Sequence, residues 1–147
     1  MNFNQISEKI AQIVPARGAF LARVKVAPDT EIKVSGTSKS FNYGELCEIA
    51  LDIVLGYEGK KEQACKADLV YKGQGVDVKA VDGYASASRG HNTDTTETLI
   101  IANYKEFVGV YQIENRQIVW TKSGKMNRAE TLARANLNRE LTALLLA

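Results

Sequence analysis

The stretch ADLVYKGQGVDVKAV, residues 67–81, decides how the fold is interpreted. Its two ends are rich in β-branched and aromatic residues, and Lys72, Gly73 and Gln74 lie between them. Two such runs joined by a short glycine-containing segment are typical of a β-hairpin. The sequence therefore predicts two antiparallel strands, at residues 67–71 and 75–81.

Three charged side chains of this hairpin are predicted to share one face. Side chains alternate between the two faces of a strand, so Asp77 and Lys79 lie on the same face, about 7 Å apart. A two-residue turn at Lys72-Gly73 or at Gly73-Gln74 places Asp68 opposite Asp77 or opposite Lys79. Both registers bring Asp68 to that face, whereas a slip of one residue would put it on the other.

Two carboxylates on neighbouring strands repel each other unless a cation holds them. Mg²⁺ fits this arrangement, because it binds one or two carboxylates and keeps water and substrate phosphate as its other ligands. A lysine beside the metal can orient a water and stabilise charge on a phosphoryl oxygen, which together favour hydrolysis of a phosphodiester. The alternative is an exposed hairpin face with an ordinary Asp–Lys pair, worth a few tenths of a kcal/mol.

The rest of the chain predicts further helices and strands. Together they indicate a single α/β domain, residues 1–147, with a mixed central β-sheet flanked by helices. The predicted elements are a helix at 4–14, a hairpin at 19–26 and 31–35, a helix at 40–55, a polar loop at 82–97, strands at 98–103, 106–113 and 117–122, and a helix at 127–145.

Composition excludes several kinds of site. Two cysteines are too few for a disulfide framework, and their spacing matches no zinc motif. A single histidine excludes histidine-rich metal sites and argues against most histidine-based triads. No run approaches the ~20 apolar residues of a membrane span, and the start, MNFNQISEKI, is too polar for a secretory signal. We therefore expect a soluble, cytoplasmic protein with no membrane partner.

The net charge of +2 is a cancellation between segments of opposite sign. Residues 43–68 hold six acidic side chains against three lysines, whereas residues 116–139 hold six basic side chains against Glu130 alone. A near-neutral total is therefore compatible with an acidic metal site and a separate basic surface for a polyanion.

The spacing D-(x)8-D-x-K on a hairpin, after a helix with an acidic residue, resembles the PD-(D/E)XK nuclease superfamily. The resemblance covers residues 43–103, and GELCE, residues 44–48, is similar to the G-x-x-x-E that begins the first core helix of that superfamily. Ala67 stands where the family often has proline, and Asp77 is the shorter of the two permitted acids. The resemblance implies a restriction endonuclease-like core at about residues 41–103, with 4–35 and 127–145 as additions.

The same resemblance assigns roles to residues. Asp68 and Asp77 would bind Mg²⁺, with Val78 included in the metal site, and Lys79 would position the attacking water. Glu48 would support the metal or its water shell from the helix, and Glu45 is the alternative for that role.

Two segments contain residues of the types that contact DNA phosphates and bases. One is the polar loop, and the other is TKSGKMNR at 121–128, which leads into a predicted helix N-terminus. The alternatives are a mobile surface loop and solvated lysines, with His91 as a DNA contact or a bystander. The candidates are Ser86, Ser88, Arg89, His91, Asn92, Lys122, Lys125 and Arg128.

The sequence thus predicts a Mg²⁺-dependent endonuclease that hydrolyses phosphodiester bonds of double-stranded DNA. A site-specific type II restriction enzyme is the favoured form, and it would act as a homodimer because each DNA strand needs one active site. The alternatives are a Holliday-junction, repair or phage nuclease of the same superfamily, and a non-catalytic DNA-binding domain.

Overall fold

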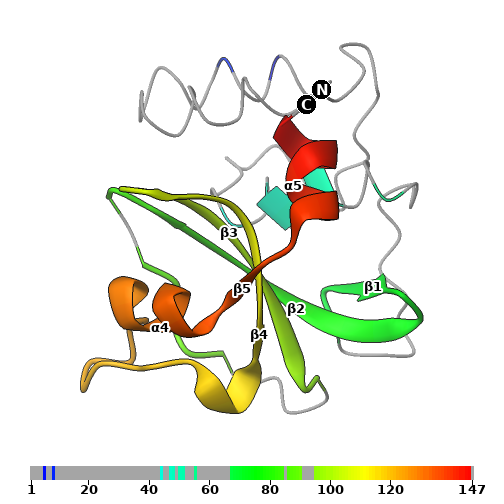
Figure 1. The fold of residues 1–147 in the computed structure, drawn as a ribbon. Helices are drawn as coiled ribbons and strands as arrows, with labels where there is room; N and C mark the ends of the chain where they lie inside the picture. Colours follow the sequence, from blue (N-terminus) through cyan, green and yellow to red (C-terminus); the bar gives the residue numbers. More distant parts are fainter. Residues whose placement is uncertain are drawn as a thin grey trace.

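The computed structural model describes residues 5, 8, 44, 47, 48, 50, 51, 55, 67–84, 86–90 and 95–146. Within this part of the chain a mixed sheet carries helices on both faces (Figure 1), which confirms the predicted α/β class. The elements are β1 (Leu69–Tyr71), β2 (Gln74–Asp82), β3 (Glu97–Tyr104), β4 (Phe107–Glu114), the 3-10 helix η1 (Asn115–Gln117), α4 (Arg128–Arg134), β5 (Asn136–Leu137) and α5 (Arg139–Leu146).

The five described strands lie in the order β1-β2-β3-β4-β5. The pair β2–β3 is parallel, and the other three pairs are antiparallel. Parallel neighbours need a crossover connection of a dozen or more residues. The predicted polar loop fulfils that role, because residues 83–96 connect the end of β2 to the start of β3.

Each face of the sheet packs against a different set of elements. Leu141 and Leu145 of α5 pack with Cys47 and Leu51 on the face that includes Val76, which we call the α5 face. The opposite surface, the α4 face, is covered by α4 and by the chain before it, and its core residues are Val81, Ile100, Ala102, Ile113, Ile118, Met126 and Leu132. Period-2 alternation along β2 places Asp77 and Lys79 on the α4 face with Val81.

The β1–β2 hairpin closes through Lys72 and Gly73. Both residues have positive φ angles, 50° and 78°, as a type I′ turn requires. The register pairs Tyr71 with Gln74 and Leu69 with Val76. The turn is therefore the first of the two predicted alternatives.

The strand predicted at 117–122 is wrong. The chain forms η1 and then an irregular segment that touches its neighbours through an isolated bridge between Trp120 and Met126. The backbone groups of Val119 explain the difference, because they bond to the start of α4 and not to another strand. The Val119 N–H donates to Thr131 Oγ1 (3.0 Å), and its carbonyl accepts from Asn127 N–H (2.8 Å).

The single helix predicted at 127–145 is also wrong, because the chain breaks between α4 and α5. Asn127 Oδ1 caps α4 by accepting from Glu130 N–H (3.2 Å), and Asn138 Oδ1 bonds to the N–H of Leu141 (3.0 Å) at the start of α5. Asparagine favours such caps over helix interiors, since its side chain competes for backbone groups. Of the four residues between the helices, Asn136 and Leu137 form β5 and pair with β4.

Several predictions fall wholly or partly outside the described residues. Gln5 and Glu8 are helical, as are the described members of 40–55 apart from Leu55, which lies in a turn, and this agrees with the predicted helices there. The hairpin at 19–35, Glu45, His91 and Asn92 lie outside the described residues. In the described segments no helix is long and apolar enough to cross a membrane.

Candidate active site

Asp68 lies beside Asp77, as in the first of the two predicted registers. The regular ladder ends at Leu69, and Asp68 then bonds to both neighbours of Asp77 on β2. Its N–H donates to the Val76 carbonyl (3.2 Å), and its Oδ2 accepts the Val78 N–H (2.8 Å). Asp77 is buried and Asp68 half-buried, so the two neighbouring residues lie where water is partly excluded.

The donor set of this pair fits a hard divalent cation. Asp68 Oδ2 is bound to the Val78 amide, but Oδ1 makes no hydrogen bond with any described residue. Val78 can contribute through its backbone only, since its side chain packs into the core of the α5 face. Carboxylate oxygens are among the hard ligands that Mg²⁺ prefers, and it keeps water at its other positions.

Glu48 is not brought into this pair. Its neighbours Cys47, Ala50 and Leu51 pack on the α5 face, whereas Asp77 belongs to the α4 face. Across the described ranges no three His, Cys, Asp or Glu side chains form a group that could hold a metal ion. The role of Glu48 therefore stays a prediction.

Lys79 is held away from the carboxylates by two other segments. Its Nζ donates to the Ser88 carbonyl (3.3 Å) and lies 5.5 Å from the ring centroid of Trp120. The ammonium is also close to Gly90, where a Cβ atom would be 3.8 Å from Nζ. Lys79 therefore faces the loop after β2.

The two predicted DNA-binding segments lie side by side. Ser88 and Lys125 form an isolated antiparallel bridge, and Lys125 Nζ donates to Ser88 Oγ (2.7 Å). The Arg89 N–H donates to the Gly124 carbonyl (2.9 Å). Ser88, Arg89, Lys122 and Lys125 are exposed and Ser86 is half-buried, so this surface gathers five of the predicted contacts.

Arg128, the sixth described candidate, is engaged within the protein. Its Nη1 donates to the Asp82 carbonyl, and its guanidinium lies 4.1 Å from the ring centroid of Tyr104. The side-chain hydrogen bond with Lys105, aided by the charges of Lys105 and Arg128, lowers the pKa of Tyr104. These contacts indicate a structural role for Arg128 at the end of β2.

The contact between Trp120 and Lys79 was not predicted from the sequence. Trp120 packs with the core of the α4 face, as expected of an aromatic residue, but its ring also lies under the Lys79 ammonium. A lysine over an indole face gains about 0.5–1 kcal/mol at exposed sites. No local pattern could have paired the two residues, because the contact depends on the irregular chain before α4.

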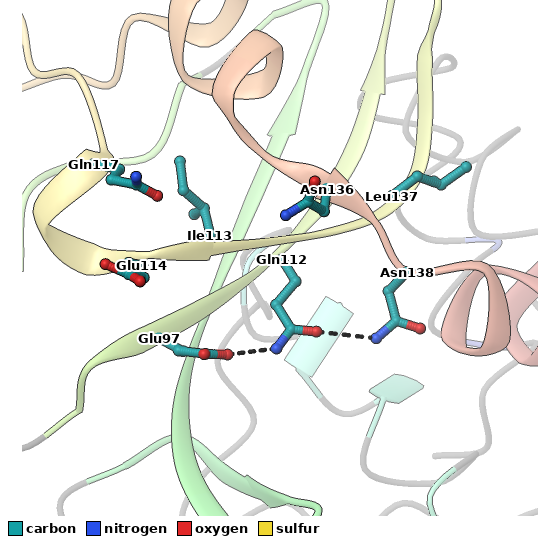
Figure 2. A pocket seen from close by; sticks show the side chains of 8 residues that line it. All are labelled: Glu97, Gln112, Ile113, Glu114, Gln117, Asn136, Leu137 and Asn138. Carbon is teal, nitrogen blue, oxygen red and sulfur yellow. Dashed lines mark hydrogen bonds between the residues drawn. The ribbon is translucent and has the colours of Figure 1, made fainter.

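Two polar cavities lie elsewhere, one beside β4 and β5 and the other beside β1 and β2. One, of about 360 Å³, is lined by Glu97, Gln112, Asn136 and Asn138 among others, and Figure 2 shows the hydrogen bonds that join Glu97 to Gln112 and Gln112 to Asn138. The adjoining cavity, of about 260 Å³, shares Glu97 and Gln112. Neither is lined by a predicted catalytic residue.

Comparisons of the chain with protein-family models, with curated proteins and with solved structures found no match. The functional argument therefore rests on the geometry of the residues themselves.

Proposed function

We propose that this chain is a Mg²⁺-dependent deoxyribonuclease with a restriction endonuclease-like core. The observation that carries the proposal is the position of Asp68, which bonds to both neighbours of Asp77 and so holds two carboxylates side by side. Lys79 follows two residues along the same strand and completes the acid-x-lysine pattern.

Each residue has a distinct role in the proposed reaction. Asp68 and Asp77 hold the metal ion, which when bound lowers the pKa of water and stabilises charge on the phosphate. The Val78 N–H fixes the Asp68 carboxylate by donating a hydrogen bond to its Oδ2 (2.8 Å). Lys79 donates from the edge of this site to an oxygen of the phosphate or of the attacking water.

The substrate in this proposal is double-stranded DNA. Ser88, Arg89, Lys122 and Lys125 form an exposed surface of hydroxyl and cationic groups next to Lys79. Phosphate contacts from such groups supply most of the affinity of a protein for DNA. For a site-specific restriction enzyme we further propose a homodimer, since each subunit would cleave one strand.

One observation favours a second candidate, a non-catalytic DNA-binding domain. The Lys79 ammonium contacts Ser88 and Trp120, and among the described residues it forms no ion pair with a carboxylate. A lysine in that position serves phosphate binding even if no metal binds. A structure-specific nuclease would share the proposed active site and differ only in the DNA that it cleaves.

Cleavage assays separate these candidates. Purified protein is incubated with plasmid DNA and with branched DNA, in Mg²⁺, in Mn²⁺ and in EDTA. The proposal predicts cleavage that EDTA abolishes and that Asp77→Ala and Lys79→Ala both lose. Discrete bands from plasmid indicate a restriction enzyme, and preferred cleavage of the branched substrate indicates a structure-specific nuclease.

The matched control is Glu106→Gln, which removes an exposed carboxylate from the turn between β3 and β4. This variant should cleave as the wild type does. DNA binding without cleavage in either metal would favour the second candidate and refute the nuclease proposal.

A further inference from the structure

Two ammonium groups converge on Ser88. Lys79 Nζ donates to its carbonyl (3.3 Å), and Lys125 Nζ donates to its hydroxyl (2.7 Å), while Trp120 lies under Lys79. These four residues come from β2, from the loop after it and from the segment before α4. We call them the Ser88 site.

The described contacts of the Ser88 site supply no negative charge. The contacts of both lysines are a carbonyl, a hydroxyl and an indole ring, none of which carries a negative charge. In the described part of the chain neither lysine lies within ion-pair distance of a carboxylate. Like charges repel, and an anion bound between the two ammonium groups would offset that repulsion.

The site is held in place by backbone hydrogen bonds. The Arg89 N–H donates to the Gly124 carbonyl (2.9 Å), and the Met126 N–H donates to the Ala87 carbonyl (2.9 Å). These bonds flank the bridge between Ser88 and Lys125, so the two lysines do not have to be ordered by the ligand. Preorganised donors bind an anion with a smaller entropic cost.

The ligand must be able to reach the donors that remain. An ammonium has three N–H groups, and the contacts with Ser88 use one on each lysine. Gly90, which lies next to Lys79 Nζ, carries no side chain that would cover it. Exposed Arg89 and Lys122 extend the positive surface on both segments, as a run of phosphates requires.

We propose that the Ser88 site binds a phosphate of the nucleic-acid backbone in the absence of metal. The choice of nucleic acid rests on the proposed function, but the site itself does not depend on the carboxylates. In this proposal Lys79 and Lys125 contact the phosphate, and Trp120 and Ser88 are positioning residues.

The test measures, by fluorescence anisotropy, how tightly the protein binds a short fluorescein-labelled DNA duplex in EDTA. The measurement is repeated over a range of salt concentrations. A plot of the logarithm of the binding constant against the logarithm of the salt concentration has a negative slope, and loss of one phosphate contact reduces its magnitude by about 0.9. At about 0.1 M salt this weakens binding about eightfold. We expect this loss in Lys79→Met and in Lys125→Met. Methionine keeps an apolar stem of similar length, and circular dichroism checks that each variant is folded.

The matched control is Lys72→Met, because Lys72 is exposed, as Lys125 is, but lies in the β1–β2 turn near Glu140 (3.7 Å). It should bind DNA as the wild type does. The proposal is overturned if Lys125→Met binds with the wild-type slope, if Lys72→Met loses as much affinity, or if the wild type does not bind in EDTA.

Cleavage measured separately distinguishes the two proposals. Lysine-dependent binding without any cleavage in Mg²⁺ or Mn²⁺ would refute the nuclease and leave the Ser88 site supported. Cleavage by the wild type, together with unchanged duplex binding by Lys125→Met, would refute the Ser88 site and leave the nuclease standing.

Discussion

Replacing Asp68 with asparagine tests the metal site without any assay of activity. Asparagine keeps an oxygen that can accept the Val78 N–H, so the hydrogen bond at 2.8 Å can persist while the negative charge is removed. Side chains of neighbouring residues on adjacent strands lie about 5 Å apart. At that separation two carboxylates repel by about 1 kcal/mol in water and about 3 kcal/mol at an effective dielectric constant of 20.

A cation bound between the carboxylates attracts each of them, and at this separation the attraction per unit charge has the same magnitude as that repulsion. Its affinity should therefore fall by at least a similar free energy when one carboxylate charge is lost. Because 1.4 kcal/mol corresponds to a factor of ten, the Kd for Mg²⁺ should rise by a factor between about five and about a hundred. The burial of Asp77 favours the upper part of this range.

Urea unfolding at increasing Mg²⁺ concentrations measures the effect. A ligand that binds only the folded state raises the free energy of unfolding by about 1.4 kcal/mol when its concentration is ten times Kd. Asp68→Asn should need at least about fivefold more Mg²⁺ for the same gain, whereas Glu106→Gln should follow the wild type. The reasoning is refuted if Asp68→Asn responds to Mg²⁺ as the wild type does, or if Mg²⁺ stabilises neither protein.

Two further predictions concern the framework around the site. Gly109→Ala should destabilise the protein by about 2–4 kcal/mol in urea unfolding, since φ is 141° and a Cβ would lie 2.9 Å from the Thr142 side chain of α5. Gly83→Ala, where a Cβ meets nothing within 4 Å, should stay within about 0.5 kcal/mol. Lys105→Met should raise the pKa of Tyr104 by removing its hydrogen bond and charge, and an unchanged tyrosine titration by NMR would contradict that cause.

The local parts of the fold could be predicted from the sequence. The hairpin follows from its two flanking runs, which allow the observed turn at Lys72-Gly73 as one of two alternatives. The strands expected at 98–103 and 106–113 lie within one residue of the corresponding parts of β3 and β4. The position of Asp68 beside Asp77 follows from the same turn, because the spacing between them is short. Period-2 patterns and tight turns depend on only about ten consecutive residues. For that reason these elements could be predicted from the sequence.

The C-terminal third shows what such patterns miss. Apolar residues at helical spacing predict one helix at 127–145, but Asn127 and Asn138 each cap a separate helix. The segment at 117–122 is as apolar as a strand, yet its Val119 backbone groups bond to Asn127 and Thr131. In both cases hydrogen bonds with asparagine or threonine side chains override the apolar pattern.

The partners of Lys79 also lay beyond sequence reasoning. The Asp77-x-Lys79 spacing indicates that the two side chains share a face of the strand. It does not indicate which groups the Lys79 ammonium contacts. The contacts with Ser88 and Trp120 depend on how the loop after β2 meets the segment before α4. Only the three-dimensional arrangement could therefore combine the hairpin with the two basic segments.

The sequence separation of the two proposed sites implies an order of assembly during folding. The hydrogen bond from Val78 to Asp68 spans 10 residues and closes with the β1–β2 hairpin, whereas the bond from Lys125 to Ser88 spans 37. Short-range contacts form faster, because closing a longer loop costs more chain entropy before any contact compensates for it. The acidic pair can therefore meet early in folding. The Ser88 site is complete only after the segment that carries Lys125 has docked. A partly folded chain would therefore lack the lysine contacts that we propose for DNA.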